Sequence, residues 1–321
     1  MESADDRLAG LLEATSRTFA LTIPYLPEPT RRAVMIAYLL LRIADTLEDG
    51  GWAREHKADA LRTLARLLRA GTPGERLDFA ARLSDDPPHA NAAYSRLIAE
   101  AHLVFAALDS LPEPEREILC RYTAITAAGM AGSVLAQEDG CVRLTSLQEL
   151  RDYCYLVAGA VGELLSELFL ADWPQLAPAA AALRRDSRAF GEGLQLTNIL
   201  KDAADDARED RHYLPGSTPR AQLFLLARED LAAAQRYVTT LLDTGAPEGV
   251  IAFTALPVRL AVGTLRAVEG RGAGAKVPRS EVIAAVAALN DALDRHALGP
   301  LLAQGWLAGD PPGSPDSPAK G

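Results

Sequence analysis

The chain has 321 residues, and 49% of them are hydrophobic, so it is long enough to bury a large apolar core. Its formal net charge is −10 and its isoelectric point is near 5.1, which argues against a nucleic-acid partner because phosphate binding needs a basic face. An acidic chain still admits phosphorylated substrates, because divalent cations can bridge carboxylates and phosphates.

Apolar residues with helical periodicity run through nearly the whole chain, whereas strand-like runs are few. The N-terminus, MESADDRLAG, lacks the basic-then-apolar order of a signal peptide. Helices are predicted at 30–47, 53–70, 92–108, 113–137, 146–170, 176–206, 219–243, 247–269 and 278–303, with a loop and a short helix within 71–91. The sequence predicts one all-α domain over residues 1–308 and a disordered, Pro/Gly/Ser-rich tail over 309–321.

No stretch of about 20 residues lacks both charges and helix breakers, so no transmembrane segment is predicted. The most apolar windows, 154-CYLVAGAVGELL-165 and 250-VIAFTALPVRLAVGTL-265, are interpreted as core helices. The three cysteines, Cys120, Cys141 and Cys154, have no metal-type spacing and are expected to be reduced, as in a cytoplasmic protein.

An acidic cluster ends the apolar segment 38-YLLLRIADTLED-49. Asp45 and Asp49 are four residues apart, so a helix places both carboxylates on one face, with Glu48 at the edge of that face. A single pair of this kind is usually a solvated helix face. The strongly apolar run before it favours a buried setting instead.

A second acidic cluster repeats the arrangement in 195-QLTNILKDAADDARED-210. Asp202 and Asp206 are again four residues apart, and Asp205 is the third neighbour. A polar stripe with the spacing i, i+3, i+7 and i+11 runs along the same helix and consists of Gln195, Asn198, Asp202 and Asp206.

Carboxylates one turn apart repel each other, and inside a cavity the repulsion grows unless a cation lies between them. Two facing carboxylate pairs suit Mg²⁺, which prefers oxygen ligands and usually shares its coordination shell with substrate phosphates. The sequence therefore predicts Mg²⁺, with Mn²⁺ as an alternative, bound together with a diphosphate.

Cationic residues flank both clusters. Arg42 lies one turn before Asp45, and Lys201 adjoins Asp202. Arginine binds phosphate through a planar fork, whereas lysine acts as a point charge. Arg17 and Arg42 are favoured as functional because apolar residues surround each of them, whereas Arg208 alone is interpreted as a helix-face ion pair.

Five blocks in order make the chain resemble the squalene/phytoene synthase family of head-to-head prenyl transferases, over about residues 12–290. The blocks are 16-SRTFALTIPYLP-27, 37-AYLLLRIADTLED-49, 153-YCYLVAGAVGELL-165, 191-GEGLQLTNILKDAADDARED-210 with 211-RHYLP-215, and 252-AFTALPVRLAVGTL-265. The resemblance implies the all-α isoprenoid synthase fold, a helical bundle around a central cavity with aspartate-rich motifs on opposing walls.

The resemblance also implies roles for individual residues. The implied metal ligands are Asp45, Glu48, Asp49, Asn198, Asp202, Asp205 and Asp206. The implied substrate-binding residues are Ser16, Arg17, Phe19, Arg42, Gln195, Lys201, Arg211 and Tyr213. Tyr153 is implicated in the first half-reaction and joins Asp45, Asp49, Asp202 and Asp206 as the catalytic set. Lys201 stands where many relatives have Arg, and Tyr155 where some have His.

The implied reaction is ionisation of an allylic diphosphate, attack on the cation by the 2,3 double bond of a second prenyl diphosphate, and proton loss to a cyclopropylcarbinyl diphosphate. Three readings stay open: a squalene-branch synthase acting on farnesyl diphosphate with NADPH as an optional reductant, a phytoene or dehydrosqualene synthase, and a catalytically inactive scaffold relative. The blocks AYLLLRIADTLED and FTALPVRLAVGTL favour the first, and the intact carboxylates disfavour the third. A lipophilic product implies transient peripheral membrane contact.

Overall fold

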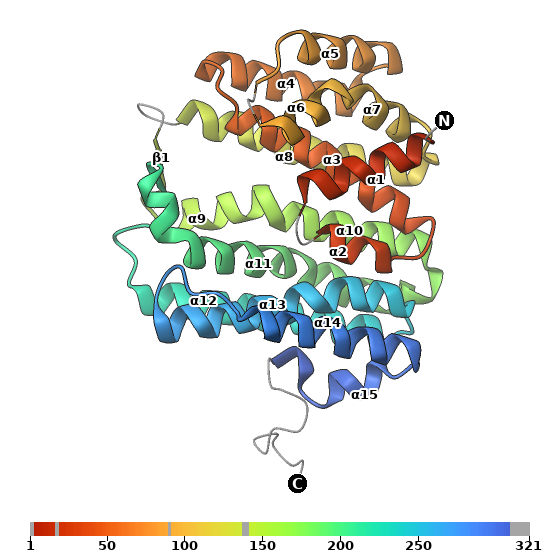
Figure 1. Cartoon of the computed structure of the whole chain (residues 1–321), viewed down its shortest axis with the longest axis vertical. Coiled ribbons are helices and arrows are strands. Elements are labelled where there is room, and N and C mark those ends of the chain that lie inside the picture. The colour runs from red at the N-terminus through yellow and green to blue at the C-terminus, as the bar shows by residue number, and fades with distance from the viewer. Residues whose placement is uncertain (1–2, 17–18, 89–90, 137–140, 309–321) are drawn as a thin grey trace. The chain divides into compact units, whose positions relative to one another are not determined.

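The computed structural model describes residues 3–16, 19–88, 91–136 and 141–308, and these are almost entirely helical (Figure 1). The predicted all-α class is therefore confirmed, while the predicted disordered tail at 309–321 lies outside the described residues. The chain divides into two compact units and changes from one to the other three times, after Gly140, within α10 (Ala160–Asp172) and after Asp172. Unit 1 comprises Met1–Gly140 and Glu163–Asp172, and unit 2 comprises Cys141–Gly162 and Trp173–Gly321.

Unit 1 is built around α3 (Thr30–Asp49), which contacts α1, α4, α7 and α8. Twelve of its 20 residues are buried, among them Leu39, Leu40 and Ile43, as expected for a central helix. The other elements are α1 (Ala4–Thr15), α2 (Phe19–Thr22), the 3₁₀ turn η1 (Ile23–Tyr25), α4 (Arg54–Ala70), α5 (Pro73–Asp85), α6 (Ala92–Ala99), α7 (Ala101–Asp109) and α8 (Glu113–Ala136).

Unit 2 is built around α11 (Ala180–Arg208), which packs against α12 (Arg220–Asp243) and α13 (Glu248–Arg271). Figure 1 shows these helices side by side. The other elements are β1 (Val142–Arg143), α9 (Leu147–Cys154), the π-helical turn η2 (Tyr155–Gly159), the 3₁₀ turn η3 (Pro174–Ala179), β2 (Arg211–His212), α14 (Arg279–Asp294), α15 (Leu298–Ala303) and the 3₁₀ turn η4 (Trp306–Ala308).

Three helix predictions were wrong in their extent. The segment 71–91, predicted as a loop with a short helix, contains the 13-residue α5. A capping box between Thr72 and Glu75, with Pro73 at the first turn, starts this helix. The single helices predicted at 92–108 and 278–303 are each interrupted, the first at Glu100 and the second before Leu298, where His296 has a φ of 52°.

Three helical segments are long and apolar enough to cross a membrane by length and composition, namely Glu113–Ala136, Leu147–Asp172 and Glu248–Arg271. No transmembrane segment was predicted from the sequence, because every stretch of this length contains charges or helix breakers. The most apolar windows of the three segments are 44%, 50% and 61% buried inside the protein, so much of this apolar surface serves the core. Cys120, Cys141 and Cys154 form no disulfide bond with one another.

The η2 turn and the start of α10 lie very close to α11. A Cβ atom added to Gly162 would lie 2.0 Å from the Ser187 carbonyl oxygen, and one added to Gly191 would lie 2.0 Å from the Ala158 carbonyl oxygen. Only glycine leaves room for this approach of the two backbones. These contacts fix η2, and therefore the adjoining α9, against the helix that carries the second acidic cluster.

Candidate functional site

In unit 1, the first set of predicted residues converges on Tyr38 of α3. The Tyr38 hydroxyl donates to the Thr15 carbonyl oxygen at 2.9 Å and accepts from Arg42 Nη2 at 2.9 Å. The ring of Phe19 lies 5.6 Å from the Tyr38 ring, centroid to centroid. Ser16 in turn accepts from the Phe19 backbone N–H at 3.0 Å. The structure thus brings Ser16, Phe19 and Arg42 into one connected group.

Arg42 also links this group to the first acidic cluster. Its Nη1 lies 3.0 Å from Asp45 Oδ2, with both side chains partly exposed. Desolvation raises the pKa of Asp45 to about 6 although 33% of its side chain is exposed. The charge of Arg42 opposes this rise, and that of Asp49 adds to it. The surroundings of Asp45 disfavour its ionised form, so a cation bound next to this carboxylate would be stabilising. Glu48 is half-buried and Asp49 is exposed.

In unit 2, α11 carries the second acidic cluster. Lys201 Nζ lies 3.3 Å from Asn198 Oδ1 and 3.1 Å from Asp202 Oδ2, so this cation joins two predicted ligands. Asp205 is 61% exposed at its side chain and pairs with Arg208. The ion pair predicted for Arg208 is therefore present.

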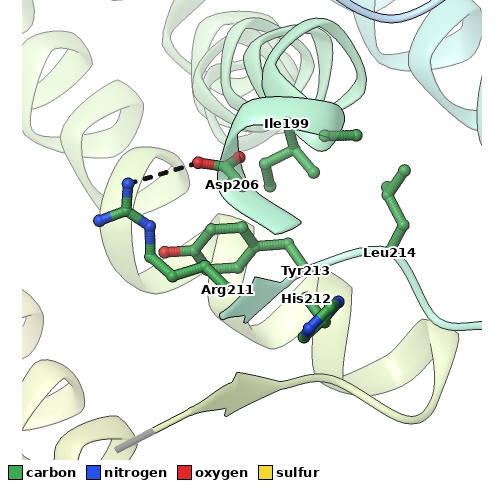
Figure 2. Close-up of a pocket in the computed structure, with 7 residues that line it drawn as sticks. Ile199, Asp206, Arg211, His212, Tyr213 and Leu214 are labelled. Atoms are coloured by element: carbon green, nitrogen blue, oxygen red, sulfur yellow. Dashed lines mark ion pairs between the residues drawn. The ribbon is translucent and has the colours of Figure 1, made fainter. Parts of the chain in front are cut away.

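Asp206 is the least exposed of the three aspartates in this cluster, with 16% of its side chain exposed. It lines a pocket of about 90 Å³ together with Arg211 and Tyr213 (Figure 2). Arg211 Nη2 lies 3.6 Å from Asp206 Oδ1. Burial raises the pKa of Asp206, and the nearby Arg211 opposes that rise while Asp202 adds to it. The remaining lining residues are Ile199, Ala203, His212 and Leu214.

Tyr153 joins this pocket region through Tyr213. The two rings are stacked, with centroids 4.8 Å apart and planes inclined by 27°. In Figure 2 the Tyr213 ring extends toward Asp206 and Arg211. The structure therefore brings Tyr153 of one sequence block to the pocket lined by Asp206 and Arg211 of another.

A short parallel strand pair sets this arrangement. β2 pairs with β1, with Val142 opposite Arg211, and the Leu144 N–H donates to the His212 carbonyl oxygen at 3.0 Å. β1 directly precedes α9, the helix of Tyr153, and β2 directly follows α11. The pairing therefore brings Arg211 and Tyr213 to the same end of unit 2 as Tyr153.

Several predicted features are not tested by these contacts. Arg17 lies outside the described residues. Gln195 is half-buried and Asn198 is exposed on α11. No three His, Cys, Asp or Glu side chains within the described parts of the chain are grouped so that they could hold a metal ion by themselves. That the two acidic clusters face each other across one cavity stays a prediction.

Sequence reasoning missed Tyr38, although it lies four residues before Arg42 and seven before Asp45 on one helix face. It also missed Glu192, which extends the polar stripe of α11 upstream of Gln195 and whose side chain is fully buried. Helical spacing was the available signal in both cases. Arg151 and Asp230, which surround Glu192, gave no such signal because they lie on other helices.

A family model described as "Squalene/phytoene synthase" matches residues 12–222. The chain is 33% identical over 211 residues to the squalene synthase of Schizosaccharomyces pombe, a match that covers 64% of this chain and 43% of that protein. The squalene synthase BSS of Botryococcus braunii is 34% identical over 203 residues, covering 62% of this chain and 40% of that protein. The chain thus spans less than half the length of these relatives.

A solved complex of TcSQS with a ligand resembles the fold, with a TM-score of 0.68, 23% identity, and coverage of 87% of this chain and 84% of that one. At this identity the likeness concerns the fold alone. It agrees with the all-α class predicted from the sequence.

Proposed function

Because the chain belongs to the squalene/phytoene synthase family, we propose that it is a prenyltransferase that joins two prenyl diphosphates head to head. The observation that carries the proposal is the family match over residues 12–222, which includes both acidic clusters and Tyr153. The relatives named squalene synthase favour two farnesyl diphosphates as the substrates and a C30 hydrocarbon as the product.

Three cationic side chains bind the diphosphate groups in this proposal. Arg42 of α3 offers a planar fork to two phosphate oxygens, as does Arg211 beyond α11. Lys201 contributes a point charge next to Asp202. Each of the three is already oriented by a neighbouring carboxylate, which lowers the cost of ordering it when a substrate arrives.

The reaction begins when the C1–O bond of one allylic substrate breaks and its electron pair leaves with the diphosphate. The 2,3 double bond of the second substrate attacks the C1 cation, and loss of a proton closes the cyclopropane ring. The stacked rings of Tyr153 and Tyr213 suit a wall beside this cation, because aromatic faces attract positive charge. Apolar neighbours such as Ile199 keep water from the cation.

The acidic clusters fit Mg²⁺ by the chemistry of their donors, since carboxylate and amide oxygens are the ligands that this ion prefers. The residues that would hold it are Asp45, Glu48, Asp49, Asn198, Asp202, Asp205 and Asp206. When bound, the ion supplies positive charge to the departing diphosphate. One or two protein carboxylates suffice where substrate phosphates complete the shell. In this proposal NADPH donates the hydride that ends the reaction. The protein is cytoplasmic and contacts the membrane transiently.

Product analysis by mass spectrometry tests this function. Purified protein is supplied with Mg²⁺ and either farnesyl or geranylgeranyl diphosphate, with and without NADPH. A C30 hydrocarbon that depends on NADPH supports the squalene ending, and a C30 polyene formed without NADPH supports dehydrosqualene. Turnover of the C20 substrate alone would move the assignment to phytoene synthesis.

Two variants test the assigned carboxylates in the same assay. Asp45→Asn and Asp202→Asn should each abolish diphosphate release, because each removes a charged oxygen ligand while preserving side-chain size. Their helical circular dichroism should match that of the wild type. Wild-type release from both variants contradicts these roles, and no release by the wild type with either substrate favours the scaffold alternative.

A further inference from the structure

An ionic cluster of four side chains lies in unit 2 beside the helix of Tyr153, with its two carboxylates buried and its two arginines partly exposed. Arg151 of α9 is its centre: Nη2 lies 2.6 Å from Glu192 Oε2, and Nη1 donates to Asp230 Oδ2 at 2.5 Å. Arg188 Nε donates to Glu192 Oε1 at 2.6 Å. Two guanidinium charges therefore balance two carboxylate charges.

Stability alone does not account for this cluster. The side chain of Glu192 is 0% exposed and that of Asp230 is 7% exposed, so both carboxylates have lost their water. The desolvation of a buried ion pair often exceeds its Coulombic gain, and apolar residues of similar volume can replace it at little or no loss. Such clusters are better suited to fixing one arrangement of the elements that they join.

The elements joined here are α9, α11 and α12, and the cluster lies around η2. Glu192 lies close to both ends of this turn. Its Oε2 faces Arg151 before the turn, and its Oε1 lies 3.2 Å from the place that a Cβ on Gly159 would occupy. The Arg188 guanidinium carbon lies 4.6 Å from the centre of the Tyr155 ring at the start of the turn.

A π-helical turn is rare and holds one more residue than an α-helical turn, so it changes the direction of the side chains around it. Tyr153 lies two residues after Arg151 on α9, and its ring stacks on Tyr213 at the pocket with Asp206. Any slip of α9 along α11 therefore moves Tyr153 relative to the pocket. A displacement of about 1 Å at a reacting site can cost about 100-fold in rate.

We propose that Arg151 is a positioning residue, which holds Tyr153 at the pocket by bridging Glu192 of α11 and Asp230 of α12. The proposal rests on the proposed function, because it assigns Tyr153 to the reacting site. Arg151 acts through Tyr153 and does not itself contact the substrate.

The test compares Arg151→Met and Arg151→Lys with the control Arg236→Met. Arg236 Nη2 lies 3.1 Å from Asp186 Oδ1, so the control also breaks an ion pair to a buried carboxylate between α11 and α12. In both methionine variants one buried carboxylate keeps another arginine, Arg188 at Glu192 and Arg185 at Asp186. Arg151→Met differs from the control in that it also removes the arginine paired with Asp230. Four quantities are measured: kcat and KM with the prenyl diphosphate, amide hydrogen exchange of residues 147–162, and Tm.

Arg151→Met should lower kcat by about tenfold or more while KM changes by less than about threefold, because misplacing Tyr153 affects the transition state more than binding. Exchange of residues 147–162 should accelerate. Arg151→Lys keeps a charge and should recover part of the kcat. Arg236→Met should keep wild-type kcat and wild-type exchange in this segment, even where Tm falls.

Three results would overturn the proposal: wild-type kcat and exchange in Arg151→Met, an equal loss of kcat in Arg236→Met, or no recovery in Arg151→Lys. If the wild type turns over neither substrate, the proposed function fails by itself. Hydrogen exchange then still decides whether Arg151 holds α9 in place, since that measurement needs no activity.

Discussion

Tyr38 of α3 connects to α1 through its hydroxyl group and to α2 through its ring. The hydroxyl donates to the Thr15 carbonyl oxygen and accepts from Arg42, while the ring contacts Phe19. The Arg42 guanidinium also lies over this ring, 5.3 Å from its centre. Arg42 is thus held by Tyr38 on one side and by Asp45 on the other. At the scale of single residues, the orientation of the arginine proposed to bind diphosphate depends on a tyrosine.

Tyr38→Phe keeps the ring but removes the hydroxyl, so Arg42 loses one of its two anchors. We expect KM for the prenyl diphosphate to rise about tenfold, which corresponds to about 1.4 kcal/mol, and the free energy of unfolding to fall by about 1 kcal/mol. Steady-state kinetics and denaturant unfolding measure the two effects. The control is Tyr237→Phe, at a buried tyrosine of unit 2 that contacts Phe190. An equal rise of KM in the control would contradict the anchoring of Arg42.

At the scale of helices and turns, two glycines allow neighbouring elements to approach closely. Gly162 and Gly191 allow α11 to lie against η2 and the start of α10, because a Cβ at either position would overlap a backbone carbonyl oxygen. A backbone atom cannot move aside as a flexible side chain can. Gly132 of α8 differs, since nothing lies within 4 Å of the place where its Cβ would be.

Gly162→Ala should therefore lower the free energy of unfolding by roughly 1–3 kcal/mol through overpacking. Gly132→Ala is the matched control: it is exposed inside a helix, and alanine should raise stability there by up to about 1 kcal/mol. Thermal or denaturant unfolding of both variants gives the comparison. Stabilisation by Gly162→Ala would show that the close contact between α11 and the start of α10 is absent.

The stability of the whole molecule should depend on pH through its buried carboxylates. Burial raises the pKa of Asp230 to about 6, Glu192 adds to the rise, and Arg151 opposes it. Asp186 is also buried, but hydrogen bonds from Arg185 and Arg236 outweigh the effect of burial and lower its pKa. These two aspartates therefore contribute to the pH dependence with opposite signs.

The stabilising contribution of Asp230 is fully present below the unfolded pKa of 3.8 and is lost as the pH rises through about 6. Relative to Asp230→Asn, the wild type should lose roughly 1–3 kcal/mol between about pH 4 and about pH 7. Relative to Asp186→Asn, the wild type should instead lose stability as the pH falls below about 4, because the pKa of Asp186 lies below its unfolded value of 3.8 and the stabilising ionised form is then lost. Denaturant unfolding from about pH 3 to about pH 7 measures both differences. A loss of stability in the same pH window for both aspartates would contradict the assignment.

The spacing of Asp45 with Asp49, and of Asp202 with Asp206, was enough to predict from the sequence that each pair shares a helix face, because helical periodicity is local. The same reasoning predicted the all-α class and most helix positions. It failed at α5, where capping chemistry outweighed the apparent loop composition, and at His296, whose left-handed backbone ends α14.

Contacts between residues far apart in the chain were decided only by the tertiary structure. The stacking of Tyr153 on Tyr213 depends on the β1–β2 pairing and on the glycines that bring η2 against α11. The bridge from Arg151 to Glu192 and Asp230 joins three helices, and no spacing within one helix encodes it. Local periodicity tells which side chains share a face of one helix, whereas the packing of backbones determines which faces meet.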